Sequence, residues 1–226
     1  RIFNGYGTTE TFWNSFLRPE DLPAMAGSAG RSCTDDEVRV VRLTGDGPAS
    51  PDDTVPTDGR TPGEIILQAS CKSALCYTQN PALTAERYHD GWFYTHDVGT
   101  WDAQHFITVC GRRDDMIVCM GENIYPAQLE EILCRHPKVA DCMAAGVPDP
   151  SRGQSVAAYI IPADASLTAQ ELGAWCARCD DLSAYKCPRY YRFVDALPYN
   201  ATGKKQHVLL QAQAEADLRA GLLLRP

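Results

Sequence analysis

The chain has 226 residues, and its 21 basic and 29 acidic side chains give a net charge of −8, so nothing in its composition indicates a nucleic-acid partner. No apolar run reaches the roughly eighteen residues of a transmembrane helix, so we expect no membrane span. Hydrophobic residues make up 44% of the chain, which is ordinary for a globular protein with one large or two smaller domains.

The ten cysteines are scattered along the chain and do not form the pattern of a disulfide framework. Several lie within apolar segments, as Cys110, Cys119, Cys134 and Cys142 do. A buried free thiol behaves as a small hydrophobic group and persists in a reducing compartment. We therefore expect a cytoplasmic protein with buried, unpaired cysteines.

The first half of the chain indicates strands separated by polar loops. Apolar patterning predicts strands over residues 37–43 and 64–69, with a loop rich in Gly, Pro and Asp between them. Asn80 followed by Pro81 predicts a helix start with Asn80 as its N-cap. A further strand is predicted at residues 106–110.

The second half has the pattern of a mixed α/β unit. Strands are predicted at residues 116–120, 139–147, 156–161 and 190–194, and helices at residues 126–135, from 168 through 175 and at 205–218. We therefore predict an α/β (α+β) fold with two domains, a β-rich one over residues 1–113 and a small α/β one over residues 114–226, with the boundary at Asp114.

The segment Tyr6-Gly7-Thr8-Thr9-Glu10 combines an aromatic ring, two hydroxyls and a carboxylate. Such a set suits base stacking, hydrogen bonds to phosphate and a Mg²⁺ ion. Taken alone, these residues favour a turn before a helix capped by threonine.

Three other segments carry charged groups in suggestive places. Asp97 follows an aromatic run and is predicted to end a strand, where a carboxylate can accept both ribose hydroxyls, although a turn or a helix cap explains it equally well. Arg112, Arg113 and Asp114 lie between two apolar strands, where charges need partners. Lys204 follows a glycine turn and suits a phosphate, although alone it indicates a solvated loop lysine.

Together, and in this order, these segments resemble those of the adenylate-forming enzymes, the acyl-CoA synthetase and luciferase superfamily. The resemblance covers nearly the whole chain and is strongest to benzoate- and chlorobenzoate-CoA ligases, in the opening RIFN, in DDMI and in GQSV. It implies the C-terminal segment of a longer polypeptide, an ATP-dependent, AMP-forming acid–thiol ligase. Such an enzyme activates a carboxylic acid as an acyl-adenylate and transfers the acyl group to CoA.

The resemblance implies roles for individual residues. Thr9 contacts the α-phosphate, Glu10 holds Mg²⁺, and Lys204 bridges the carboxylate and the α-phosphate. The small domain rotates about Asp114 between the two half-reactions. The remaining assignments are ATP or AMP contacts at Tyr6, Gly7, Thr8, Asp97 and Arg112, an acyl pocket at Gly5, Phe12 and Trp13, and CoA contacts at Gly121, Glu122, Asn123, Arg152, Tyr185, Lys186 and Arg189.

The sequence departs from the family pattern in ways that bear on CoA and ATP. Arg152 stands where related ligases have tryptophan, and Cys187 stands where they have arginine. The Ser/Thr/Gly-rich loop with a lysine that holds the β- and γ-phosphates is not in the sequence, and most of the acyl pocket should precede Arg1. We therefore expect this chain to be inactive alone.

Alternatives to the CoA ligase stay open at this point. One is a truncated, non-catalytic binding module, and another is an adenylating enzyme that delivers the acyl group to a carrier protein. Benzoate-like acids are the first expectation for the substrate and medium-chain fatty acids the second, since Phe12 and Trp13 suit a flat or apolar acid. Packing in the core explains these two residues equally well. A homo-oligomer stays open as well.

Overall fold

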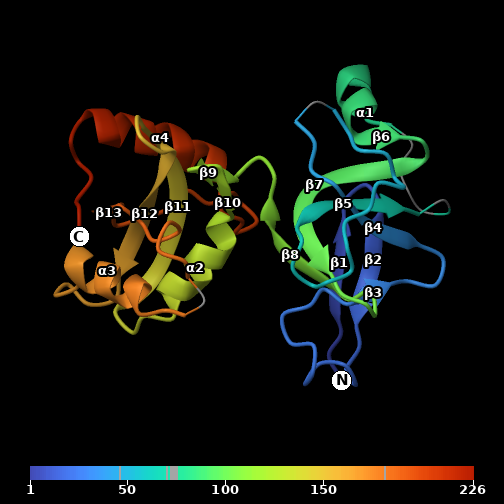
Figure 1. Ribbon diagram of the computed structural model, residues 1–226, viewed down its shortest axis with the longest axis horizontal. Coiled ribbons are helices and arrows are strands. Elements are labelled where there is room, and N and C mark those ends of the chain that lie inside the picture. The colour runs from blue at the N-terminus through green and yellow to red at the C-terminus, as the bar shows by residue number, and fades with distance from the viewer. Residues whose placement is uncertain (46, 70, 72–75, 181) are drawn as a thin grey trace. The chain divides into compact units, whose positions relative to one another are not determined.

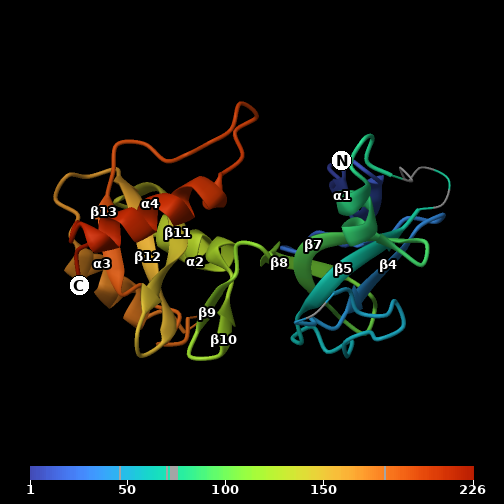
Figure 2. The same ribbon diagram turned by 90° about the horizontal axis from the view of Figure 1, so that it is seen from above.

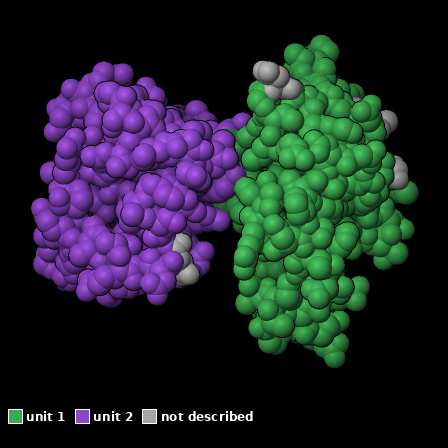
Figure 3. Space-filling view, viewed as in Figure 1, with its two compact units in different colours: residues 1–113 green, residues 114–226 purple. Residues whose placement is uncertain are grey.

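The computed structural model describes residues 1–45, 47–69, 71, 76–180 and 182–226. The chain forms two compact units, residues 1–113 and residues 114–226, coloured separately in Figure 3. Each unit has its own sheets and its own buried core. Among the described residues, no helix is long and apolar enough to span a membrane.

Unit 1 contains a small sheet in the order β1-β2-β3 and a larger one in the order β4-β5-β7-β6, with β8 paired to β7 (Figure 1). Its strands are β1 (Asn4–Thr8), β2 (Phe12–Leu17), β3 (Arg31–Ser32), β4 (Glu37–Val41), β5 (Gly63–Gln68), β6 (Tyr88–His89), β7 (Trp92–Trp101) and β8 (Ile107–Arg112). The helix α1 (Pro81–Arg87) begins as predicted, because the Asn80 side chain accepts a hydrogen bond from the Leu83 N–H at 3.1 Å.

The central strand β5 of the larger sheet is buried on both faces. Ile65 and Leu67 pack with Phe93 on one face, and Ile66 packs with Tyr94 on the other. Side chains of a strand alternate between the faces, so its uninterrupted apolar run fills two cores at once.

Tyr6 to Glu10 do not precede a helix, which corrects the turn-and-helix interpretation of that segment. The chain instead returns at once through β2, which pairs with β1 in an antiparallel hairpin with an irregularity between Tyr6 and Gly7. A Cβ atom at Gly7 would lie 1.6 Å from the backbone oxygen of Phe12. Glycine is therefore required for the two strands to approach this closely.

Unit 2 is a sheet covered by helices on both faces. Its strands run in the order β10-β9-β12-β11, and β13 lies parallel beside β12. The strands are β9 (Ile117–Cys119), β10 (Glu122–Ile124), β11 (Val139–Asp149), β12 (Gly153–Pro162) and β13 (Tyr190–Phe193), and the helices are α2 (Pro126–Cys134), α3 (Ala169–Ala177) and α4 (His207–Arg219). Figures 1 and 2 show α4 on one face and α2 and α3 on the other.

The alternation of β11 explains this three-layer arrangement. Cys142 and Ala144 belong to the core beneath α2 and α3, whereas Met143 and Ala145 belong to the core beneath α4. Both faces of the strand are therefore apolar, as expected for a central strand between helices. The predicted mixed α/β class is confirmed.

All ten cysteines are free thiols. Cys110, Cys119 and Cys142 are buried as predicted, but Cys134 is exposed. Cys134 is the last residue of α2, where the helix leaves the core, and this position explains the error. Its sulfur lies 3.5 Å from that of Cys142.

Candidate functional site

Three residues that the sequence assigns to nucleotide binding lie together in unit 1. The Tyr6 hydroxyl donates to Oδ2 of Asp97 at 2.7 Å, and an Arg112 nitrogen lies 3.0 Å from Oδ1 of the same carboxylate. They come from β1, β7 and β8, and Asp97 is the register partner of Arg112. A carboxylate, a phenol and a guanidinium that are distant in sequence thus form one cluster.

Asp97 lies within β7 and does not end it, which corrects the sequence prediction. The strand continues to Trp101, but it is distorted here, because His96 has a φ of 58° and the pairing with β8 shifts between Val98 and Gly99. The Asp97 N–H donates a hydrogen bond to the Thr95 hydroxyl oxygen at 2.9 Å. A positive φ at a non-glycine residue inside a strand is uncommon and places the carboxylate at a local kink.

The Tyr6 phenol remains a hydrogen-bond donor in this cluster. Its burial and the neighbouring Asp97 charge raise the pKa of Tyr6 well above its usual value. A carboxylate offers about four acceptor positions, so two protein partners leave Asp97 able to accept further hydroxyl donors. The cluster is therefore chemically suited to a diol such as a ribose.

The charges before the domain boundary have partners, as the sequence predicted. One Arg113 nitrogen lies 3.0 Å from Oε2 of Glu64, whose side chain is 3% exposed, and another donates to the Thr44 carbonyl. The other Glu64 oxygen accepts from the His96 N–H at 3.1 Å. Arg113 thereby ties the end of unit 1 to the kink that carries Asp97.

The turn between β1 and β2 holds the hydroxyl and carboxylate groups of the first motif. The Thr8 and Thr11 hydroxyls are 2.9 Å apart, and Thr11, which is fully buried, donates to Asn14 at 2.6 Å. Thr9 is exposed in this turn. Thr11 is thus part of the interior of the hairpin.

Glu10 has a partner that sequence analysis missed. The Tyr77 hydroxyl donates to a Glu10 oxygen at 2.6 Å. Among the described residues, no group of three or more His, Cys, Asp or Glu side chains is suitably placed to hold a metal ion. Glu10 alone nevertheless fits Mg²⁺, because this ion commonly takes one or two protein carboxylates and completes its shell with phosphate oxygens and water.

The residues assigned to the acyl pocket lie on the same hairpin and do not pack into the core of unit 1. Phe12 is 64% exposed, Trp13 is 58% exposed, and the Trp13 ring lies 6.1 Å from that of Phe16. A Cβ atom at Gly5 would come within 2.9 Å of both the Trp13 and Phe16 rings. Glycine at this position therefore leaves room for the two rings.

Lys204 lies in unit 2 at the end of a tight loop over residues 200–204. The Asn200 side-chain oxygen accepts from the N–H groups of Thr202 and Lys204, and the Asn200 N–H donates to the Lys204 carbonyl at 2.9 Å. Gly203 has a φ of 78°, which favours glycine. The Lys204 side chain is exposed.

The first residues of unit 2 border a small cavity. Asp114 and Asp115 line about 290 Å³ together with Gln154 of β12 and His207 and Gln211 of α4. The expected hinge residue, Asp114, is therefore the first residue of unit 2 and lies near the N-terminal end of α4, the helix that follows the Lys204 loop.

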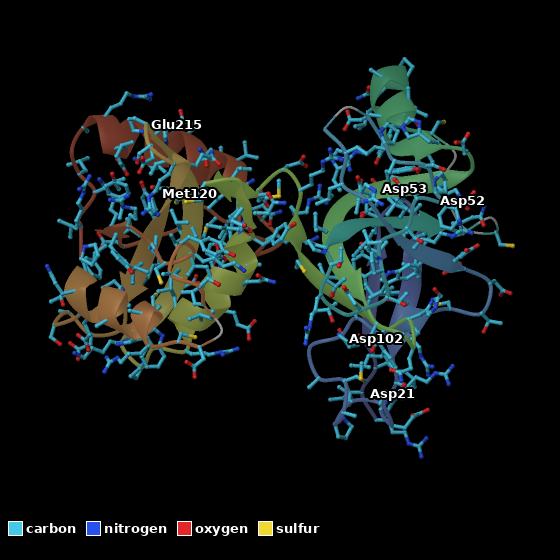
Figure 4. The ribbon with its side chains drawn as sticks, in the orientation of Figure 1. Asp21, Asp52, Asp53, Asp102, Met120 and Glu215 are labelled. Carbon is cyan, nitrogen blue, oxygen red and sulfur yellow. The ribbon has the colours of Figure 1, made fainter. Side chains whose placement is uncertain are left out.

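Three of the residues assigned to CoA contacts, Gly121, Glu122 and Asn123, lie in the β9–β10 hairpin. Met120 (Figure 4) and Gly121 occupy its two-residue turn with φ values of 55° and 82°. Positive φ at both positions is the pattern of a type I′ turn, which suits glycine and strains methionine. The Met120 N–H donates to the Arg152 carbonyl at 2.9 Å, so Arg152 lies beside this turn, and Glu122 and Asn123 follow it in β10.

Tyr185, Lys186 and Arg189, which are also assigned to CoA contacts, lie on the segment that enters β13. Arg189 is 3.6 Å from Asp149, and the Lys186 ammonium lies 6.0 Å from the centre of the Tyr185 ring. Hydrogen bonds from Ser155 and Ser151, together with Arg189, hold the pKa of Asp149 well below its usual range.

Residues 128–204 match the model of the AMP-binding enzyme C-terminal domain. The chain belongs to the adenylate-forming superfamily. Over 92% of its length it is 38% identical to sulfoacetate–CoA ligase from Cupriavidus necator, and over 97% it is 31% identical to a long-chain-fatty-acid–CoA ligase from Escherichia coli O157:H7. The expected superfamily resemblance is therefore confirmed.

Solved structures of adenylate-forming enzymes share the fold. o-Succinylbenzoate CoA synthetase from Bacillus subtilis, in complex with its acyl-adenylate, superposes on 92% of the chain with a TM-score of 0.81 and 32% identity. The anthranilate CoA ligase AuaEII in complex with anthranoyl-AMP also has a TM-score of 0.81, with 31% identity over 98% of the chain. The chain spans 37% of the Escherichia coli ligase and about 40% of the two solved proteins, so it matches part of each adenylate-forming enzyme.

This member of the superfamily has two contacts that sequence reasoning missed. Tyr77, which binds Glu10, lies 67 residues away in sequence, and no local signal links them. Glu130 accepts hydrogen bonds from Lys205 and His207. Its helical spacing from Pro126 and Leu133, both buried, was a signal that Glu130 faces the core.

Proposed function

We propose that the chain is the C-terminal segment of an ATP-dependent ligase that activates a carboxylic acid as an acyl-adenylate and transfers the acyl group to CoA. The observation that carries the proposal is the cluster of Tyr6, Asp97 and Arg112, whose chemistry suits a nucleoside. Relatives along nearly the whole chain are named as CoA ligases, which supports the same reaction.

In this proposal unit 1 supplies nucleotide contacts. Tyr6 stacks on the adenine, with Gly7 and Thr8 beside it, and Asp97 accepts the ribose hydroxyls with Arg112 assisting. Thr9 donates to the α-phosphate. Glu10 helps to hold Mg²⁺, and when bound this ion neutralises phosphate charge.

Lys204 supplies the charge that the first half-reaction requires. A carboxylate and a phosphate repel each other, and an ammonium between them offsets the negative charge that grows as the carboxylate oxygen attacks the α-phosphorus. Its exposed place on a tight loop supports this role, because the side chain is available to a ligand. Pyrophosphate leaves and the acyl-adenylate remains.

The second half-reaction, transfer of the acyl group to CoA, needs another orientation of unit 2, which carries Lys204. Rotation about Asp114 withdraws Lys204 and presents the turn of Gly121, Glu122 and Asn123 to the pantetheine arm. Arg152, Tyr185, Lys186 and Arg189 then contact the CoA nucleotide. The proximity of the Arg152 backbone to the β9–β10 turn supports a shared binding surface.

The proposed substrate is an aryl or apolar carboxylic acid. Phe12 and Trp13 form an exposed aromatic wall, which supports an aryl or apolar acyl group. The names of the relatives range from sulfoacetate to long-chain fatty acids and o-succinylbenzoate, so they do not favour benzoate in particular. We also propose a cytoplasmic protein, because its ten cysteines are free thiols.

The test uses the full-length protein that contains this chain, a panel of benzoates, fatty acids and short polar acids, and ATP with Mg²⁺. AMP, pyrophosphate and thioester are measured with CoA, with a carrier-protein pantetheine arm and with an amine as acceptors. We expect AMP and a CoA thioester with one class of acid, and a loss of about 100-fold or more in Lys204→Ala. AMP formation that does not require an acid would contradict the proposal, and a product with another acceptor would correct its second step.

A further inference from the structure

Lys204 and Lys205 are adjacent in the sequence, but their surroundings differ. The Lys205 ammonium lies 3.0 Å from Oε2 of Glu130 and 3.4 Å from Oδ1 of Asp141, and it also donates to the Cys142 carbonyl. Lys204 is exposed. The charge of Lys205 is thus neutralised inside unit 2.

The partner of Lys205 is a buried carboxylate held from several elements. Glu130 on α2 is 5% exposed and accepts from the Ala144 N–H of β11 at 2.9 Å and from Nε2 of His207 on α4 at 2.8 Å. A buried carboxylate with these partners has a fixed position, and removing one of them leaves charge uncompensated. Glu130 therefore provides a rigid anchor for the residue that follows Lys204.

The base of the Lys204 loop is fastened on both sides. Tyr199 and Lys205 face each other in an antiparallel bridge, and the Tyr199 hydroxyl donates to Asp141, which also pairs with Lys205. Adjacent residues of an extended segment direct their side chains to opposite sides. With the Lys205 side chain directed towards Glu130 and Asp141, the Lys204 side chain is directed outwards and is exposed.

We propose that Lys205 and Glu130 are the positioning pair for Lys204, fixing the base of its loop and the direction of its side chain. This inference rests on the proposed role of Lys204 in adenylation. It divides the tandem lysines into one that contacts the reacting groups and one that orients its neighbour. It also implies that Lys205 itself does not contact phosphate.

The first test compares Lys205→Met with Lys138→Met in the full-length protein, by acid-dependent exchange of pyrophosphate into ATP. Lys138 is the matched control, because it forms a 3.0 Å pair with Glu171 in the same unit. Misplacement of a reacting group typically costs about 100-fold, so we expect kcat to fall by at least ~30-fold in Lys205→Met, with KM for ATP and acid within ~3-fold. Lys138→Met should stay within ~2-fold, and Lys205→Arg should recover most of the rate because it retains the charge.

The second test does not depend on the reaction. Peptide-level hydrogen exchange of the same full-length variants should show faster exchange over residues 199–205 in Lys205→Met, since the N–H groups of Gly203 and Lys204 are bonded within the loop. Glu130→Gln should show the same change, and it replaces Lys205→Met if that variant does not fold. Lys138→Met should exchange as the unmodified protein does.

The outcomes separate this inference from the proposed function. Unchanged kcat and unchanged exchange over residues 199–205 would overturn the positioning pair, as would equal losses in Lys138→Met. If the unmodified full-length protein lacks acid-dependent activity, the proposed function fails. The hydrogen-exchange comparison then decides alone whether Lys205 and Glu130 anchor the loop.

Discussion

The Tyr6 hydroxyl and the Asp97 carboxylate, 91 residues apart in the sequence, form a 2.7 Å hydrogen bond between β1 and β7. The bond joins the small sheet of unit 1 to its larger sheet. It therefore links the aromatic ring proposed to stack on adenine with the carboxylate proposed to bind ribose.

Two variants of Tyr6 separate its hydroxyl from its ring. Tyr6→Phe removes the hydrogen bond and should lower the free energy of unfolding by about 1 kcal/mol, as measured by urea denaturation. It keeps the ring, so KM for ATP in the full-length protein should change by less than ~3-fold, whereas Tyr6→Leu should raise it by ~10-fold through lost stacking. Equal KM values for the two variants would argue against stacking on the base.

Gly7→Ala tests the close approach of β1 and β2. A Cβ atom there would overlap the Phe12 backbone, so we expect a loss of more than about 2 kcal/mol in the free energy of unfolding, measured by thermal or urea denaturation. Gly45→Ala is the matched control, because a Cβ atom at Gly45 has no neighbour within 4 Å. Similar free energies of unfolding for the two variants would show that β1 and β2 do not approach this closely at Gly7.

Alkaline pH should destabilise the protein through its tyrosines. Burial and the nearby Glu64 charge raise the pKa of Tyr94 to about 12, and burial with the hydrogen bond to Asp141 raises the pKa of Tyr199 to about 12. Their folded pKa values lie above the unfolded value near 10, so this stabilisation is complete below about pH 10 and is lost as the pH rises from 10 to 12.

Urea denaturation between pH 9 and 12 measures this effect. Tyr94, which is buried, contributes a slope of at most about 1.4 kcal/mol per pH unit, and solvent screening makes the contribution of Tyr199, which is 40% exposed, smaller. Tyr94→Phe should therefore flatten the decline. A free energy of unfolding that stays constant across this range would contradict the raised pKa values of Tyr94 and Tyr199.

Trp13→Ala tests the proposed acyl wall. Trp13 is 58% exposed, so its removal should cost little stability, within about 0.5 kcal/mol by urea denaturation. If Trp13 contacts the acid, kcat/KM for the preferred acid should fall by ~10-fold while KM for ATP changes by less than ~2-fold. If Trp13→Ala has the same preference among acids as the unmodified protein, Trp13 does not line the acyl pocket.

The local chemistry of the sequence predicted much of the fold. Asn80 before Pro81 marks a helix start that the structure confirms, because capping depends on neighbouring residues. The β1–β2 hairpin was not predicted from the sequence. Its turn ends at Phe12 with a φ of 56°, and a positive φ is not expected for phenylalanine.

The candidate site likewise combines residues that local motifs predict with contacts that only the fold determines. The motifs identified Tyr6, Asp97, Arg112 and Lys204 as candidates, but the pairing of Glu10 with Tyr77 depends on tertiary packing. Nor does the sequence tell which of Lys204 and Lys205 forms ion pairs within unit 2. That difference follows from buried Glu130, 75 residues before Lys205, which pairs with Lys205.

The most direct test of the account is carboxylate-dependent exchange of pyrophosphate into ATP, measured for the full-length protein and for this 226-residue chain in parallel. The account predicts exchange by the full-length protein with one class of acid, its near loss in Lys204→Ala, and none by the 226-residue chain. Exchange by the short chain would contradict its expected inactivity, and no exchange by either protein with any acid would contradict the proposed ligase and favour a non-catalytic binding module.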